Sequence, residues 1–469
     1  MNSVLAVLAL IVCLGVIVVV PDHSGAAAAL VICALVAAPA SFAIFRAKID
    51  NKFLLQLFVA ALLARMVVGT LINVSELQEF FGGDANTYDT FAVALLKALA
   101  GDQYYSGLVQ RFQGEFGGGA VGMIYMVAAV YKIIGRNMLA VQFFNSVLGA
   151  ATPPAIFLIA HSIFGNLRVS RLASLFVAFF PSLVLWSSQG LKDGPIVFML
   201  AMSVLLTLRL GEKFSLKNAL VLAAILATLT SFRFYLFFMV VAAIVGAFTI
   251  GLREFTVTGF VRQLLIVVGI GLALTYIGVI KTANIQFGYY SDLNVVQRSR
   301  LDLATSAKSG FGADVDVSTA SGAIQAVPIG VVYLLFAPFP WQLESLRQSI
   351  TLPEMLVWWA AFPFLVLGFW FTFRYRLRQS FVIFIFTTML TLAYSVFQGN
   401  VGTAYRQRAQ ILVFYFIFVA VGIVLLKEKL EERKIRDYAE GRKVVPSIAT
   451  SLVPGRRVMT KGASPRPQS

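Results

Sequence analysis

Asp84 is the first residue of this chain whose surroundings suggest chemistry. It follows the glycine pair at 82–83, Tyr88 lies one helical turn further on, and Asp89 stands beside that tyrosine. A carboxylate at a helix start can simply accept the unpaired N–H groups of the first turn. Alternatively, two nearby carboxylates can raise one pKa towards the range useful for abstracting a proton. Asp84 is therefore either a helix cap or a general base.

A second acid, Asp193, stands between two apolar segments in the run Lys192-Asp193-Gly194-Pro195. Proline suits the first turn of a helix, so a helix is expected to begin here. Asp193 could cap that helix and pair with Lys192. It could instead be a second catalytic acid facing Asp84 across a cavity, with Lys192 holding a phosphate. Both interpretations stay open.

Arginines form the third group of candidates. The run Tyr405-Arg406-Gln407-Arg408 leads directly into an apolar segment. The planar guanidinium group of arginine can grip two phosphate oxygens at once. Simple snorkelling to the membrane surface would also explain the pair, but arginine is disfavoured on the non-cytoplasmic side. We therefore expect phosphate binding, with Arg233 and Lys281 as further candidates for the same role.

Arg65 lies inside an apolar run, in Leu62-Leu63-Ala64-Arg65-Met66. A charge at that depth in a membrane is costly and indicates a function by default. It could reach the outer interface or pair with an acid.

The elements that position these residues are expected to be membrane-spanning helices. Of 469 residues, 59% are hydrophobic and 13% charged, with a mean hydropathy of +0.83, whereas a soluble domain is nearer a quarter charged. Apolar runs long enough to cross a bilayer recur along the chain. The fold class predicted is all-α, a polytopic transmembrane helical bundle. The net charge of +16 then reads as a topology signal, and no nucleic-acid partner is expected.

Fourteen apolar segments are visible. They lie near 3–20, 25–46, 53–73, 118–135, 138–162, 168–188, 194–211, 217–231, 234–251, 262–281, 326–341, 353–373, 379–397 and 409–426. If all of them crossed, short loops rich in Lys and Arg would face outward, against the positive-inside rule. About 12 crossings repair this, with 118–135 and 326–341 as re-entrant or interfacial helices. Gly117-Gly118-Gly119 and the prolines at 338 and 340 suit such segments. Fourteen crossings remain the alternative.

The twelve-crossing topology divides the chain. Residues 1–426 form a transmembrane domain with outer loops at 74–117 and 282–325. Residues 427–469 form a basic cytoplasmic tail, partly disordered because its end is polar and aperiodic. The N- and C-termini are both expected in the cytoplasm. The basic residues expected on the cytoplasmic side are Arg46, Lys48, Lys52, Arg168, Arg171, Lys213, Lys217, Arg253, Arg262, Arg374, Arg376 and Arg378.

With these residues placed, the chain resembles the GT-C superfamily of membrane glycosyltransferases, such as protein O-mannosyltransferases and the lipid A aminoarabinose transferase. The motifs that carry the resemblance are Gly83-Asp84-Ala85-Asn86-Thr87-Tyr88, Ile134-Gly135, Phe164-Gly165, Phe180-Pro181, Asp193 and Tyr405-Arg406-Gln407-Arg408. The resemblance is clearest over residues 80–211. Ala85 departs from it, since the family usually has an acid there.

The resemblance implies a reaction. The donor would be a polyprenyl-phosphate-linked sugar and the acceptor a glycan, lipid or protein, in a multi-pass protein of the bacterial inner membrane. Asp84 would deprotonate the acceptor hydroxyl, with Asp193 as second catalytic acid, and cations would stabilise the departing lipid phosphate. The expected substrate-binding residues are Tyr88, Asp89, Lys192, Arg233, Tyr405, Arg406 and Arg408. Some relatives use a divalent metal, which Asp84 and Asp193 could hold.

Two other functions compete with this one. A polysaccharide polymerase or O-antigen-ligase-like enzyme would use arginines rather than a base, with its site in the loop at 282–325 around Arg298 and Arg300. A transporter or flippase of lipid-linked sugars would be expected to have repeated halves and broken helices at mid-membrane. No convincing internal repeat is visible in the sequence.

Overall fold

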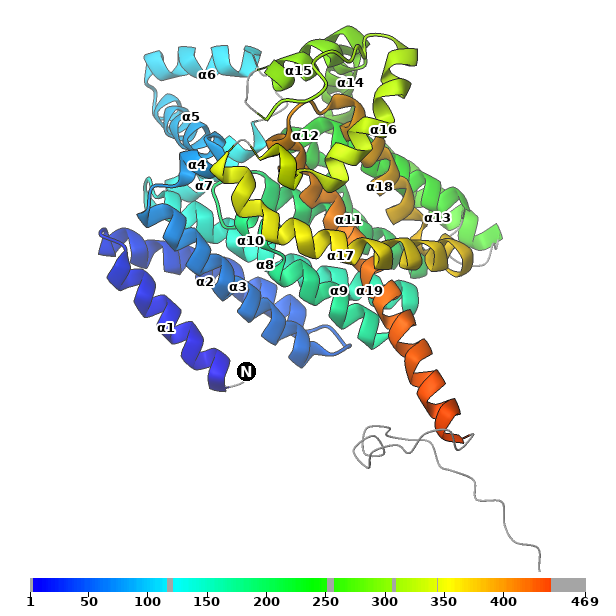
Figure 1. Ribbon diagram of the computed structural model, residues 1–469. Helices are drawn as coiled ribbons and strands as arrows, with labels where there is room; N and C mark the ends of the chain where they lie inside the picture. The colour runs from blue at the N-terminus through cyan, green and yellow to red at the C-terminus, as the bar shows by residue number, and fades with distance from the viewer. Residues whose placement is uncertain (1–2, 116–120, 251–256, 306–308, 344, 440–469) are drawn as a thin grey trace, which may run out of the picture. The chain divides into compact units, whose positions relative to one another are not determined.

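The computed structural model describes residues 3–115, 121–250, 257–305, 309–343 and 345–439. Regular structure within these ranges is helical (Figure 1), apart from one isolated bridge between Gly310 and Asn400. The predicted all-α polytopic bundle is therefore confirmed. Gly117-Gly118-Gly119, Arg253 and the tail beyond residue 439 lie outside the described residues. The chain divides into two units, Met1–Gly422 and Ile423–Ser469.

The first half of the chain supplies eleven helices among the described residues. They are α1 (Ser3–Val19), α2 (His23–Phe45), α3 (Asn51–Val74), α4 (Gln78–Gly82), α5 (Asp84–Leu99), α6 (Gln103–Glu115), α7 (Gly122–Ile134), α8 (Met138–Phe164), α9 (Leu167–Phe179), α10 (Pro181–Ser187) and α11 (Asp193–Glu212). Helix α8 is buried along most of its length because it packs against α2, α3, α9 and α11.

The second half begins with the long helix α12. Its helices are α12 (Leu216–Ile250), α13 (Val257–Tyr276), α14 (Val279–Tyr290), α15 (Leu293–Thr305), α16 (Ala320–Phe336), a 3₁₀ turn at Pro340–Gln342, α17 (Leu346–Tyr375), α18 (Leu377–Phe397) and α19 (Val401–Ala439). Helix α12 packs against α11 and α18, and α16 packs against α18.

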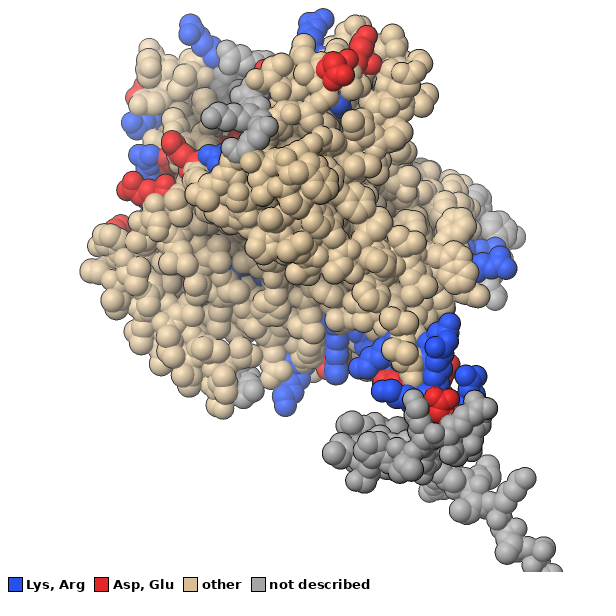
Figure 2. All heavy atoms as spheres, viewed as in Figure 1, with Lys and Arg blue, Asp and Glu red and all other residues tan. Residues whose placement is uncertain are grey.

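Eight of the described helices are long and apolar enough to cross a membrane: α2, α3, α8, α11, α12, α17, α18 and α19. The bent pair α9 and α10 makes a ninth span if it counts as one. Figure 2 shows a broad uncharged surface over α1, α2 and α17, with charged side chains gathered over α4 and α5. The chain is thus an integral membrane protein with several spans.

Helix α12 reverses direction at Arg233, where the backbone is non-helical with φ −155° and ψ 97°. Arg233 lies beside Asp193 at the start of α11. Ten residues further along each helix, Ala243 and Ser203 line one small cavity, so this half of α12 runs parallel to α11. The half before the kink starts just after α11 ends. The two halves of α12 therefore run in opposite directions and correspond to the separate apolar segments 217–231 and 234–251. Their two crossings of the membrane remain a prediction.

The reversal in α12 adds one candidate crossing of the membrane. Eight long helices, the bent pair and a second pass of α12 give ten candidate crossings among the described residues. Twelve crossings are reached if the shorter apolar helices α1 and α13 also cross. The shorter apolar helices also include α7 and α16, which correspond to the segments 118–135 and 326–341. Their re-entrant or interfacial placement remains a prediction.

Two buried charged side chains form hydrogen bonds with backbone groups next to the break between α9 and α10 at Phe180-Pro181. Since Pro181 interrupts the helical ladder, nearby backbone groups need other partners. Arg65 of α3 donates from Nη1 to the Ala178 carbonyl at 2.9 Å, and the Ser182 N–H donates to Glu354 Oε2 of α17 at 2.6 Å. Arg65 therefore neither reaches the interface nor pairs with an acid. Arg65 supplies a hydrogen-bond donor to a backbone carbonyl of the interrupted helix, so its role at this depth is structural.

Replacing Glu354 by Ala is expected to destabilise the protein. The Ser182 N–H and the Tyr405 hydroxyl, which donates to Glu354 Oε2 at 2.8 Å, would both lose their acceptor, at about 1–3 kcal/mol for each buried group. Thermal unfolding in detergent measures the effect. Glu354→Gln keeps one acceptor oxygen and should lose less; equal losses in the two variants would contradict this account.

The two ends of the bundle carry different groups. Asp50, before α3, pairs with Arg171 of α9 at 2.7 Å, and Ser162 of α8 donates to Glu212 of α11 at 3.1 Å. The basic connections α2–α3, α8–α9 and α11–α12 therefore share one end. Asp193 opens α11 at the other end, about 30 Å away by the helical rise.

Candidate active site

An ion-pair cluster lies at the end of the bundle remote from the basic connections. Arg406 of α19 bridges two acids that are far apart in sequence. Its Nη1 donates to Asp84 Oδ2 at 2.8 Å, and its Nε donates to Asp193 Oδ2 at 2.6 Å. The Asp193 side chain is 1% exposed and the Asp84 side chain 50%. The structure therefore brings together three residues that the sequence put forward separately, with one acid buried and one accessible.

Neither acid caps its helix. Asp84 and Asp193 are the first residues of α5 and α11, and the capping positions are Gly83 and Lys192, without a side-chain cap bond. The carboxylates still lie in the first turn, where the helix dipole favours negative charge. Of the two interpretations of Asp193, the one in which it caps its helix and pairs with Lys192 is contradicted, since its ion pairs are with arginines.

Arg233 is the second arginine of the cluster. Its Nη2 lies 3.6 Å from Asp193 Oδ1, and its Nη1 donates to the hydroxyls of Tyr235 and Tyr394 at 2.8 and 3.2 Å. Tyr394 in turn donates to Gln410 at 2.8 Å. Gln410 lies one helical turn beyond Arg406 on α19, so the network joins α11, α12, α18 and α19 and fixes the arginines in place.

Lys192 adds a third positive group, in the turn between α10 and α11. Burial lowers the pKa of its ammonium from the ordinary 10.5 to about 8, with the charge of Arg233 acting in the same direction. The turn is held from α8 by Asn145, whose Nδ2 donates to the carbonyls of Gln189 and Leu191 at 2.6 and 2.8 Å. Asn145 thus positions both Lys192 and Asp193, and the sequence reading missed it.

Tyr88 lies against the same charges. It is buried on α5, and burial, followed by the charge of Asp84, raises the pKa of its phenol. No described residue forms a hydrogen bond with its hydroxyl. A neutral donor at this position is available to a bound molecule.

Asp89 lies apart from the cluster. Its carboxylate accepts hydrogen bonds from the Tyr131 hydroxyl at 2.5 Å and from Arg136 Nε at 3.1 Å, and it pairs with Arg136 Nη2. Five residues beyond Asp84 on α5, it is tied to α7 and the connection to α8. The structure does not bring the two carboxylates together as the predicted acid pair.

Tyr405 and Arg408 also point elsewhere. Tyr405 is buried and donates to Glu354. Arg408 is fully buried and donates from Nη1 to the carbonyls of Leu335 and Ala337 at 3.0 and 3.1 Å, at the end of α16. Positions 406 and 408 differ by about 200° around a helix. The expected pair of phosphate-binding arginines therefore reduces to Arg406.

The remaining cationic candidates have separate settings. Lys281 is exposed on α14. Arg300, proposed for a ligase-like site, is 1% exposed and donates to the carbonyls of Val396 and Gln398 at 2.9 and 2.8 Å. It fastens α15 to the end of α18, while Arg298 is exposed. Arg300 is thus inaccessible to a substrate in this structure.

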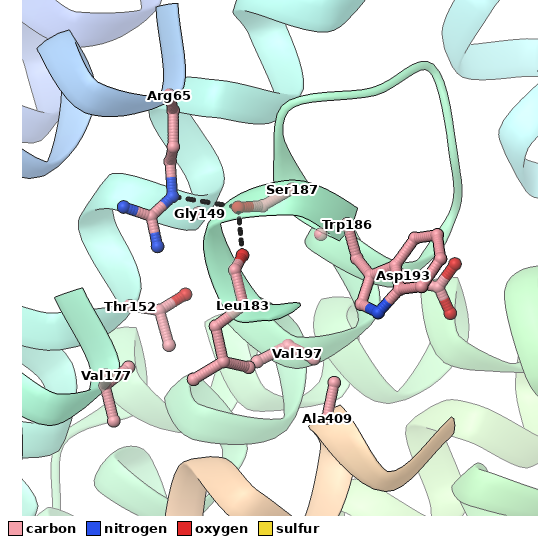
Figure 3. A pocket seen from close by; sticks show the side chains of 11 residues that line it. Arg65, Gly149, Thr152, Val177, Leu183, Trp186, Ser187, Asp193, Val197 and Ala409 are labelled. Atoms are coloured by element: carbon pink, nitrogen blue, oxygen red, sulfur yellow. Dashed lines mark hydrogen bonds between the residues drawn. The ribbon is translucent and has the colours of Figure 1, made fainter. Parts of the chain in front are cut away.

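A narrow cavity of about 20 Å³, enough for about one water molecule, lies behind Asp193. Arg65 and Asp193 are at opposite ends of it, with Trp186 beside Asp193 (Figure 3). The Arg406 guanidinium lies over the Trp186 ring, 5.7 Å from its centre. Trp186 therefore contacts both the cavity and the arginine that bridges the two acids.

The charges of the cluster favour an anion. Two carboxylates, Asp84 and Asp193, face three cations, Arg233, Arg406 and Lys192. A phosphate that approaches through the exposed side of Asp84 meets this positive excess. Because Asp193 and the tyrosines hold the arginines in place, little reorganisation is needed to bind it.

The donor set does not fit a divalent metal. Among the described residues, no three or more His, Cys, Asp or Glu side chains are grouped to hold one, and both Asp84 and Asp193 are bound to Arg406. Hard cations require more oxygen ligands than these two carboxylates supply.

Fold and site together define a polytopic all-α membrane protein with a cationic, acid-bearing site at one end of its spans. Residues 120–278 match the family model described as dolichyl-phosphate-mannose-protein mannosyltransferase. This match confirms the resemblance to the GT-C superfamily of membrane glycosyltransferases. No curated protein sequence matches the chain.

One similar solved structure is the archaeal oligosaccharyltransferase AglB from Archaeoglobus fulgidus, in complex with an inhibitory peptide and a dolichol-phosphate. It shares 11% sequence identity with this chain at a TM-score of 0.42. The similarity covers 71% of this chain and 46% of that chain. The match thus spans less than half the length of that protein.

Proposed function

We propose that the protein is a membrane glycosyltransferase that transfers a sugar from a polyprenyl-phosphate donor to an acceptor hydroxyl. The observation that carries the proposal is the Arg406 bridge between an accessible carboxylate and a buried one, with Arg233 and Lys192 beside it. The family match over residues 120–278 supports the same class of donor, because that family is named for a dolichyl-phosphate sugar.

Each residue then has a role. Asp84, half exposed, removes the proton as the acceptor oxygen bonds to the anomeric carbon. The bond between that carbon and the phosphate oxygen breaks, and the electron pair leaves with the lipid phosphate. Arg406, Arg233 and Lys192 stabilise the charge that develops there. Asp193 is too enclosed to meet the acceptor, so it positions the two arginines.

We place the cluster on the non-cytoplasmic face. The opposite end carries the basic connections between α2 and α3, α8 and α9, and α11 and α12, and short basic loops favour the cytoplasm. Both termini are then cytoplasmic and the membrane is the bacterial inner membrane. A thiol reagent that cannot cross the membrane tests this with a cysteine at exposed Thr87. Labelling only from the cytoplasmic side would contradict the placement.

The transfer itself is tested with purified protein in lipid nanodiscs. Polyprenyl phosphates that carry single hexoses or pentoses are incubated with it, together with candidate glycan, lipid and peptide acceptors. Mass spectrometry should detect free polyprenyl phosphate and a glycosylated product for one of the donors. Movement of an intact lipid-linked sugar across the bilayer without a new glycosidic bond would instead identify a flippase.

The reaction is expected to slow as the pH rises through about 8. Burial lowers the pKa of Lys192 to about 8. Its side chain is therefore positively charged below that pH and loses the charge above it. Donor kcat/KM, which reports the free enzyme, should therefore fall on the alkaline side. In Lys192→Arg the charge persists, and this decline should disappear. An unchanged alkaline decline in the variant would remove Lys192 from the donor site.

A further inference from the structure

A polar hollow of about 600 Å³ lies beside the first turn of α5. Its lining residues are Glu76, Gln78, Glu79, Asn86, Asp89, Arg136 and Met138. Its volume is within the 300–1,000 Å³ range common for small-molecule sites. Figure 2 shows acidic and basic side chains close together over α4 and α5. None of the ion-paired residues around Arg406 lines the hollow.

The lining favours hydroxyl groups. Of the seven residues, only Met138 is apolar, and the others carry carboxylates, amides or a guanidinium. Asn86 Nδ2 donates to Glu79 Oε1 at 3.2 Å, and Arg136 is tied to Asp89. These contacts orient donors and acceptors before any ligand arrives. Each sugar hydroxyl both donates and accepts a hydrogen bond, so it can use either kind of group.

The hollow and the proposed base flank the same short stretch of chain. Glu79 belongs to α4, which ends one residue before Gly83, and Asn86 follows Asp84 in the first turn of α5. The Asp84 side chain is half exposed. Arg347 of α17 also fastens this stretch by donating to the Glu79 carbonyl at 3.0 Å. Asp84 does not line the hollow, and Asn86 and Asp89 lie about 200° and 140° from it around α5. A glycan held in the hollow must therefore extend past the first turn of α5 to bring a hydroxyl to Asp84.

We propose that this hollow is the acceptor subsite and that the acceptor is a carbohydrate. The proposal rests on the proposed function, because the glycan held here carries the hydroxyl that Asp84 deprotonates. A lipid tail or an apolar peptide would cover these polar groups without replacing their hydrogen bonds with water, which is unfavourable. The predicted ligand is a neutral, hydroxyl-rich sugar within a glycan that continues to Asp84.

Saturation-transfer NMR on the full-length protein in nanodiscs tests the subsite without any donor. The probes are methyl glycosides of glucose, galactose, mannose and N-acetylglucosamine, with an acetylated Ser-Thr peptide amide for comparison. At least one glycoside should receive saturation from the wild type and from Asp84→Asn. The signal should fall at least tenfold in Glu79→Ala and in Asn86→Ala. Because Glu79 and Asn86 are exposed, both variants should keep the wild-type melting temperature.

Asp302→Asn changes an exposed acid on α15. It serves as the matched control and should bind like the wild type. Three results would overturn the subsite: saturation of the peptide but of no glycoside, saturation of none of the probes, or a glycoside signal in Glu79→Ala equal to that of the wild type. Failure of the proposed function looks different. In that case the glycoside still binds and depends on Glu79, but no donor yields a glycosidic bond.

Discussion

Asp84→Asn should lower the rate of transfer by about 10²- to 10⁴-fold, the range that a positioned general base contributes. The amide cannot take a proton, yet it can still accept the hydrogen bond from Arg406 Nη1. Arg406 also keeps its contact with Asp193. The donor site should therefore stay assembled, and the loss should appear in kcat while the donor KM changes little. Turnover of the donor that the panel identifies measures both.

Two controls separate this loss from misfolding. Asp302→Asn makes the same chemical change at an exposed acid, and it should transfer at the wild-type rate. The melting temperature of Asp84→Asn should also match the wild type, since the Asp84 side chain is half exposed. If Asp84→Asn keeps full activity, the reaction needs no base at this position and an arginine-only, ligase-like mechanism becomes the better account.

Much of the fold follows from the apolar runs. The positions of the spans, and the turn that divides α12 near Arg233, were predictable because lipid demands long apolar helices and internal hydrogen bonding. The short segments were harder. Helices α4 and α6 and the bend between α9 and α10 depend on contacts with distant residues, such as Glu354 with Ser182, which no local pattern records.

The residue types of the site were predictable from the sequence, but the directions in which their side chains point were not. Asp84 and Asp193 stood out as acids at expected helix starts, and Arg406 stood out as an arginine expected on the non-cytoplasmic side, where arginine is disfavoured. Arg408 stood out for the same reason, yet the helical rotation turns it towards the end of α16. Asp89 similarly turns to Arg136. A helical projection of residues 401–410 would have separated Arg406 from Arg408.

Some positioning residues gave weaker signals. Asn145 is one polar residue within the long apolar helix α8, and its two carbonyl partners lie more than forty residues away. Trp186 reads as an ordinary interfacial aromatic until Arg406 is found over its ring. In both cases the functional meaning comes from a tertiary contact, so the residue type alone could not supply it.

Arg406→Met should lower the rate of transfer by about 10²- to 10³-fold and destabilise the protein. Removing a cation that stabilises developing charge commonly costs about 10²- to 10³-fold in rate. In addition, Asp193, 1% exposed, would keep only Arg233 at 3.6 Å. Breaking a buried ion pair from one side costs about 3–5 kcal/mol because a charge stays buried without its partner. Thermal unfolding and donor turnover report the two effects separately.

The double variant Arg406→Met, Asp193→Asn distinguishes charge balance from catalysis. It removes both members of the buried pair, so most of the lost stability should return, since an apolar or neutral pair is tolerated where a lone charge is not. Transfer should stay at the level of the single variant, because the lipid phosphate still lacks its main cation. If the double variant instead regains wild-type turnover, Arg406 serves only to neutralise Asp193. The charge on the leaving phosphate must then be met by Arg233 and Lys192 alone.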